Sequence, residues 1–86
     1  MTIIRKKIWP DGFELISSGK KRFDFRLSDF EVLEGDVLRL EEWDPKKKRY
    51  TGRHLDKTVA YVAKFDLDTY GQKKEILEKG FQIIQF

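Results

Sequence analysis

The spacing of apolar residues at the start of the chain predicts a strand followed by a short helix. Residues 2–8 (TIIRKKI) are typical of a first strand. Pro10 and Asp11 then suit a helix start, because proline fixes φ near the helical value and an acidic residue favours the positive end of the helix dipole. Helical spacing continues over residues 10–18, and Gly19 is a typical helix stop.

Directly after this glycine the pattern changes from helical to alternating. Arg22, Asp24 and Arg26 fall on one side of an extended chain, whereas Phe23 and Phe25 fall on the other. A period of two is the pattern of a strand with one buried face. We therefore expect a second strand with phenylalanines toward the core and charges toward solvent.

In the rest of the chain, turn signals separate a series of extended segments. We predict a turn at 33–36, a strand at 37–43, an exposed hairpin loop at 44–52, a strand at 55–65, a helical turn or two within 70–79 and a last strand at 81–86. The connections between successive strands look too short for parallel crossovers. The pattern thus predicts a small α+β fold, a mostly antiparallel β-barrel of about five strands with one or two short helices.

Composition narrows the class of protein. The 86 residues include no cysteine and one histidine, which leaves no disulfide framework, thiolate zinc site or cysteine nucleophile. Aromatic residues make up 14% of the chain, so we expect one domain, 1–86, with an aromatic core. No apolar run approaches the roughly 20 residues that cross a bilayer, and MTIIRKKIW lacks the apolar core of a signal peptide. We expect a cytoplasmic protein with no membrane contact and no cofactor.

The formal net charge is only +3, but half of the cations lie in two short segments. The first contains Lys20, Lys21, Arg22 and Arg26, and the second contains Lys46, Lys47, Lys48, Arg49 and Arg53. In the first, a carboxylate beside a guanidinium orients it and leaves donors free for an anionic or planar ligand. The alternatives are an ordinary solvated strand face for the first segment and a solubilising hairpin tip for the second.

The order Gly19-x-Lys21-x-x-Asp24-x-Arg26 after a short helix resembles the signature of ASCH domains, a group of PUA-like β-barrels. Further matching segments are IWP at 8–10, SGKK at 18–21, EGDVL at 34–38, LEEWD at 40–44, YTGR at 50–53 and GFQII at 80–84. Together they resemble a small ASCH-like family of unassigned function over nearly the whole chain. The sequence departs from this pattern at Asp24, where the signature commonly has glutamate, and at Ile4 and Arg5, where the family tends to have a histidine.

The resemblance implies a cleft beside the barrel, floored by the signature, that accommodates RNA or a modified base. In such a cleft Lys20, Lys21 and Arg22 would contact phosphates, while Asp24 and Arg26 would frame a base edge. The second basic segment would extend the backbone-binding surface if the hairpin carries it toward the cleft. The favoured partner is therefore RNA or a nucleotide-like ligand.

Two other functions remain open. Some small ASCH proteins are amidohydrolases that deacylate a modified cytidine, and Lys21 stands where their lysine would be. Asp24 occupies the place of their threonine, so a hydroxyl nucleophile is missing, and Glu75 or Glu78 would stand for their glutamate. The third possibility is a protein-interaction module in which the loop at 44–53 contacts an acidic partner.

Overall fold

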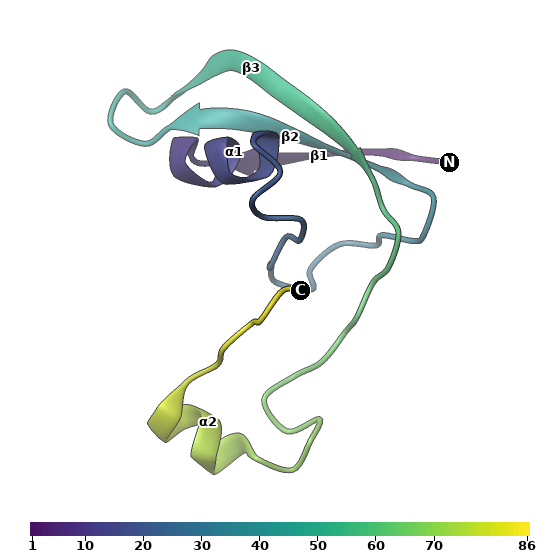
Figure 1. Ribbon diagram of the computed structural model, residues 1–86, viewed down its shortest axis with the longest axis vertical. Coiled ribbons are helices and arrows are strands. Elements are labelled where there is room, and N and C mark those ends of the chain that lie inside the picture. The colour runs from purple at the N-terminus through teal and green to yellow at the C-terminus, as the bar shows by residue number, and fades with distance from the viewer.

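Three strands and two helices form the regular structure of the computed structural model, which describes residues 1–86 (Figure 1). In chain order they are β1 (Ile3–Ile8), α1 (Pro10–Ser17), β2 (Val37–Asp44), β3 (Arg49–Thr58) and α2 (Lys73–Lys79). The expected small α+β fold is confirmed. Neither helix has the length and apolar character needed to cross a membrane.

The strands form one open sheet in the order β1-β2-β3. β1 runs parallel to β2, with Ile3 opposite Val37, and β2 runs antiparallel to β3, with Asp44 opposite Arg49 at the hairpin. The expectation of short antiparallel connections was wrong for the first pair. The whole segment 9–36, which includes α1, connects β1 to β2 and is long enough for a parallel crossover.

Helix α1 covers one face of the sheet, and the core lies between them. Ile8, Phe13, Ile16 and Leu40 are the buried apolar residues, with Leu38 and Leu55 packed against them. Because side chains alternate across a strand, the neighbours of these strand residues face the opposite, uncovered side. The core is thus three aliphatic side chains and one ring, and less aromatic than the composition indicated.

A tight turn positions the start of β2. Gly35 has φ 91°, a conformation that favours glycine. The buried carboxylate of Asp36 accepts hydrogen bonds from the backbone N–H groups of Thr2 and Leu33, at 3.1 and 3.0 Å. One side chain therefore joins the beginning of β1 to the turn that precedes β2.

The predicted barrel of about five strands is not observed, because three predicted strand segments lack a backbone ladder. Segments 22–26 and 81–86 form no strand, and β3 begins earlier than expected and ends at Thr58. Val59 still bonds to the backbone of Gly35 and Asp36, but residues 60–65 lie outside the ladder. Alternation reports which way side chains face, but a strand also needs a partner for its backbone groups. These segments are instead linked by side chains: Phe25 and Phe65 both contact Phe81.

Helix α2 lies at the far end of the molecule from α1 and the sheet (Figure 1). Gly80, at φ 77°, ends this helix as predicted. From there the chain returns toward the sheet, where its last residues meet the segment that follows α1. The molecule is elongated, with extents of 41 × 33 × 26 Å.

Candidate nucleic-acid interface

Asp24 and Arg26 of the signature segment form an ion pair that is anchored to the edge of the sheet. The Arg26 Nε donates to Asp24 Oδ2, and its Nη2 donates to the carbonyl oxygen of Lys7 at 2.8 Å. The Arg26 side chain is only 24% exposed and the Asp24 side chain only 20%. β1 is an edge strand, so its outer carbonyl groups are available to such a donor. The carboxylate orients the guanidinium, and the strand edge holds it in place.

Lys7 connects this pair to an aromatic corner on the uncovered face of the sheet. Its ammonium lies 3.7 Å from the centroid of the Trp43 ring and 5.8 Å from that of Tyr50. The two rings face each other across β2 and β3 at 5.0 Å, with an interplanar angle of 77°. A cation over the face of a tryptophan is attracted by the ring quadrupole. Lys7 thus contacts the signature segment through its carbonyl oxygen and the β2–β3 hairpin through its ammonium group.

The hairpin itself carries a cavity of about 350 Å³ beside this corner. It is lined by Asp44, Lys47, Arg49, Tyr50 and Thr51. The Asp44 Oδ1 accepts hydrogen bonds from the backbone N–H groups of Lys46 and Lys47, at 2.9 and 3.1 Å. These bonds, that of Lys47 first, hold the pKa of Asp44 below its usual value.

The cavity therefore combines a ring that is half exposed with two cations. Tyr50 is 51% exposed, Lys47 and Arg49 line the cavity with it, and Lys46 and Lys48 are exposed on the same loop. The Asp44 bonds restrain the turn, so these groups extend from a fixed base. This combination suits a ligand with one planar and one anionic part.

The other cations of the first basic segment lie apart from the Asp24–Arg26 pair. The Lys20 side chain is exposed, and the Lys21 ammonium lies 5.0 Å from the centroid of the Phe23 ring and forms no ion pair. Arg22 donates from Nη2 to the carbonyl oxygen of Phe86 at 3.1 Å. Lys21, Asp24 and Arg26 thus do not converge on the hairpin cavity.

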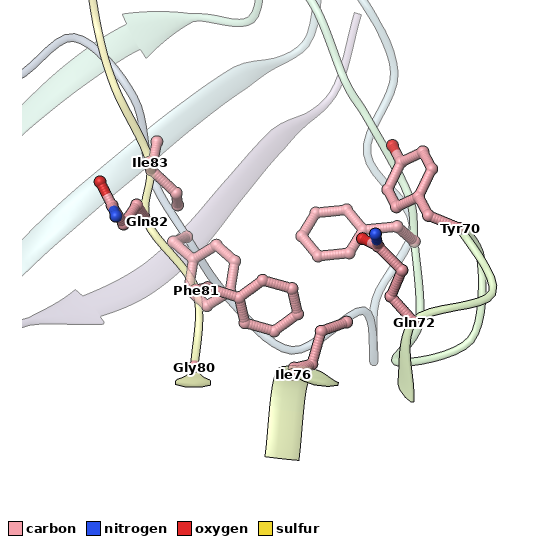
Figure 2. A pocket seen from close by; sticks show the side chains of 9 residues that line it. Tyr70, Gln72, Ile76, Gly80, Phe81, Gln82 and Ile83 are labelled. Atoms are coloured by element: carbon pink, nitrogen blue, oxygen red, sulfur yellow. The ribbon is translucent and has the colours of Figure 1, made fainter. Parts of the chain in front are cut away.

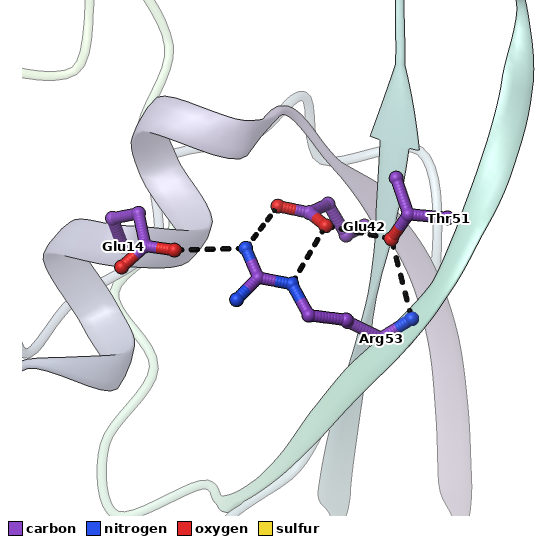
Figure 3. A network of polar contacts seen from close by, with 4 residues as sticks. All are labelled: Glu14, Glu42, Thr51 and Arg53. Atoms are coloured by element: carbon purple, nitrogen blue, oxygen red, sulfur yellow. Dashed lines mark hydrogen bonds and ion pairs between the residues drawn. The ribbon is translucent and has the colours of Figure 1, made fainter.

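Arg53 turns away from the hairpin tip and forms a network on the other face of the sheet (Figure 3). Its Nε and Nη2 donate to the two carboxylate oxygens of Glu42 at 2.9 and 2.7 Å, and Nη2 also donates to Glu14 at 2.8 Å. The Thr51 hydroxyl donates to Glu42 at 2.6 Å. The guanidinium carbon lies 4.5 Å from the centroid of the Phe13 ring.

This network connects α1 to the hairpin and shifts the pKa values of Glu42 and Arg53. The Glu42 side chain is only 4% exposed, and its hydrogen bonds from Arg53 and then Thr51 lower its pKa to about 2. The two carboxylates raise the pKa of Arg53 above its already high value. Arg53 was predicted to be a ligand-binding residue of the loop, but most of its donors are already used.

An apolar cavity of about 410 Å³ lies near α2. Its lining includes Phe25, Phe65 and Phe81, with Tyr70 and Ile76 at the sides (Figure 2). Glu75 and Glu78 lie on α2 without forming an ion pair, and neither lines this cavity. No three His, Asp or Glu side chains gather closely enough to hold a metal ion.

Comparison with known proteins places the chain in a family. Residues 5–83 match the family model described as a domain of unknown function, DUF3850. The chain belongs to the DUF3850 family. No curated protein and no solved structure matches it. The family description carries no activity, so the function of this DUF3850 domain has to be argued from its geometry.

Lys7 links the Asp24–Arg26 pair to Trp43 in this DUF3850 domain, and it was not among the predicted site residues. It lies in the predicted first strand, where Arg5 and Lys7 alternate with the apolar Ile4 and Ile8. This alternation indicates that Lys7 faces away from the core. It does not indicate that the Lys7 ammonium reaches Trp43, which lies two residues past Glu41, the register partner of Lys7 on β2, because that depends on the parallel register of the two strands.

Proposed function

We propose that this domain binds single-stranded RNA or a nucleotide-like ligand across one continuous surface. That surface, the RNA interface, consists of the Asp24–Arg26 pair, Lys7, the Trp43–Tyr50 corner and the hairpin cavity. The observation that carries the proposal is the double contact of Lys7, whose carbonyl accepts from Arg26 while its ammonium lies over Trp43. Two basic segments that are far apart in the sequence meet there.

Each part of the RNA interface has a role that its chemistry supports. The half-exposed ring of Tyr50 offers a face on which an unstacked base can stack. Lys47 and Arg49 flank this ring in the same cavity and suit a phosphate. The remaining donors of Arg26 suit a second phosphate or a base edge. Arg53 is left out of the proposed surface, because its Nε and Nη2 are bonded to carboxylates on the other face of the sheet.

The resemblance to ASCH domains supports the same class of ligand, and the proposal extends to their fold. Segments 59–65 and 81–86 are already drawn together by Phe65 and Phe81, whose ring centroids are 5.7 Å apart. We propose that in the RNA-bound domain residues 60–65 and 81–84 pair with residues 23–26 as the remaining strands of a PUA-like barrel, which leaves residues 20–22 and 85–86 outside the ladder. Hydrogen exchange tests this, because their backbone amides would become protected when RNA is added; continued fast exchange contradicts it. A cytoplasmic location completes the proposal.

The binding test is a fluorescence anisotropy titration with a short labelled single-stranded RNA at two salt concentrations. We expect Tyr50→Ala to weaken binding by about 5- to 150-fold, which corresponds to the loss of one base–aromatic stack. Arg26→Ala combined with Lys47→Ala should also weaken binding and lower the slope of log K against log salt by about 0.7 for each lost phosphate contact.

The matched control is Lys73→Ala combined with Lys74→Ala, which removes two cations from α2, far from the RNA interface. This variant should bind nearly as the wild-type protein does. No binding at low salt, or equal losses in the control and interface variants, would contradict the proposal.

No contact favours the amidohydrolase alternative. Lys21 forms no ion pair with a carboxylate, Asp24 is paired with Arg26, and Glu75 and Glu78 lie on the distant α2. Incubation with N4-acylated cytidine, followed by chromatography for free cytidine, is the assay that would revive it.

A further inference from the structure

A side-chain amide near the C-terminal end of the chain forms hydrogen bonds with the backbone on both sides of Lys21. The Gln85 Oε1 accepts a hydrogen bond from the Arg22 N–H at 2.6 Å, and its Nε2 donates to the Lys20 carbonyl oxygen at 3.0 Å. Both bonds lie in exposed parts of the structure. One planar amide thus satisfies one donor and one acceptor of the signature segment.

The direction of these backbone groups follows from the preceding helix. The Lys21 N–H donates back to the Leu15 carbonyl oxygen of α1 at 2.9 Å. In extended backbone, the C=O before a residue and the N–H after it point away from that residue's own N–H. The Lys20 carbonyl and the Arg22 N–H therefore face outward together, between three cationic side chains.

We propose that this outward pair of backbone groups binds the Watson–Crick edge of an unpaired base, and that Gln85 occupies the site until RNA displaces it. The inference rests on the proposed function and adds a second contact point to it. Each of the four RNA bases presents an adjacent donor and acceptor on this edge, as a carboxamide does. In a duplex those groups are already paired, so the site selects single strands.

The exchange of Gln85 for a base leaves no polar group unsatisfied. Two hydrogen bonds to the amide are replaced by two to the base, and the released amide is hydrated. Little burial is lost, because Gln85 is exposed and the Phe86 side chain is fully exposed. Lys20, Lys21 and Arg22 carry these backbone groups on one short segment, and their cations suit the phosphates on either side of the base, that of Arg22 once it leaves the Phe86 carbonyl oxygen.

Because Gln85 competes with RNA, the apparent affinity of the site is its intrinsic affinity multiplied by the fraction of molecules in which Gln85 has left it. Removal of Gln85 should therefore tighten binding, whereas the loss of a merely structural contact would not. We expect Gln85→Ala to lower the Kd for labelled oligouridine by about three- to tenfold, since it removes two competing hydrogen bonds. Gln82→Ala is the matched control, because Gln82 is exposed on the same segment and forms no hydrogen bond.

Two modified probes separate base recognition from charge. An oligomer of 3-methyluridine has the same phosphates but lacks the N3–H donor, and an RNA duplex has its base edges paired. Neither should bind Gln85→Ala more tightly than it binds the wild-type protein. In addition, the side-chain amide resonances of Gln85 in the wild-type protein should shift when oligouridine is added.

The outcomes distinguish this site from the RNA interface as a whole. If oligouridine binds with the expected dependence on Tyr50 and Arg26, but Gln85→Ala binds equally or more weakly and the Gln85 resonances do not move, the site at Lys21 is wrong and the interface stands. An equal gain with 3-methyluridine also overturns base-edge recognition. If neither the wild-type protein nor Gln85→Ala binds RNA, both proposals fall.

Discussion

Residues 3–58 and 59–86 are held together in different ways. All six buried residues lie in the first region, along with the backbone ladders of the sheet and four of the five ion pairs. The second region contains α2, an aromatic cluster shared with Phe25, and a 3.9 Å ion pair from Lys64 back to Glu31. Apolar side chains are present in both, so the difference lies in backbone pairing and burial, not in composition.

The proposed binding surfaces divide along the same line. Lys7, Trp43 and the hairpin cavity belong to the first region, where the sheet and the Arg53 network hold them in place. Gln85 belongs to the second, where little is buried and displacement costs little. A preformed surface combined with a displaceable amide is the arrangement on which the single-strand proposal depends.

The largest expected difference between the two regions is in the free energy of unfolding of two leucine-to-alanine variants. Leu40 is 1% exposed in the core, whereas Leu77 is 69% exposed on α2. Leu40→Ala should lower the free energy of unfolding by about 2–5 kcal/mol, because it removes buried methyl groups and leaves a cavity. Leu77→Ala should change it by less than about 0.5 kcal/mol. Urea unfolding measures both, and similar losses would mean that the two regions share one core.

Lowering the pH should have an effect of intermediate size on the stability of the first region, through Glu42. The pKa of Glu42 is lowered from an ordinary value of 4.5 to about 2, so unfolded chains take up its proton at a higher pH than folded ones. The stability from this carboxylate is fully present above about pH 4.5 and is lost as the pH falls toward 2. Thermal unfolding followed by tryptophan fluorescence reports on the first region, which contains both Trp9 and Trp43.

Glu42→Gln is the matched variant, because it keeps the size of the side chain and removes the titration. Its Tm should depend less steeply on pH between 4.5 and 2 than that of the wild-type protein. Parallel curves for the two proteins would show that the Arg53 network does not stabilise the fold.

The smallest effect compares two glycines that both have a positive φ. Gly35, at φ 91°, precedes β2, and Gly80, at φ 77°, ends α2. Alanine at either position should introduce roughly 1–3 kcal/mol of local strain. For Gly35→Ala we expect a loss of global stability in urea. For Gly80→Ala we expect faster hydrogen exchange within α2 alone, and a global loss of equal size would show that the two regions unfold together.

Much of the local structure was predictable from the sequence because its causes are local. Pro10 and Gly19 bracket α1, Gly35 marks the turn before β2, and Gly80 ends α2, as expected from their intrinsic backbone preferences. The strands at 2–8 and 37–43 also formed nearly as predicted. The strands at 22–26 and 81–86 did not, although residues 22–26 alternate clearly, because a side-chain pattern carries no information about a pairing partner.

The candidate interface shows the same division. The sequence by itself determined the two basic segments, the Asp24–Arg26 pair, which is local, and the face of each strand on which a side chain lies. Only the tertiary structure decided that Lys7 joins these segments, that Arg53 is withdrawn into a network with Glu42, and that Gln85 reaches the backbone beside Lys21. The physical reason is that each of these contacts depends on strand register or on the path of a long connection, and both are set by packing between distant parts of the chain.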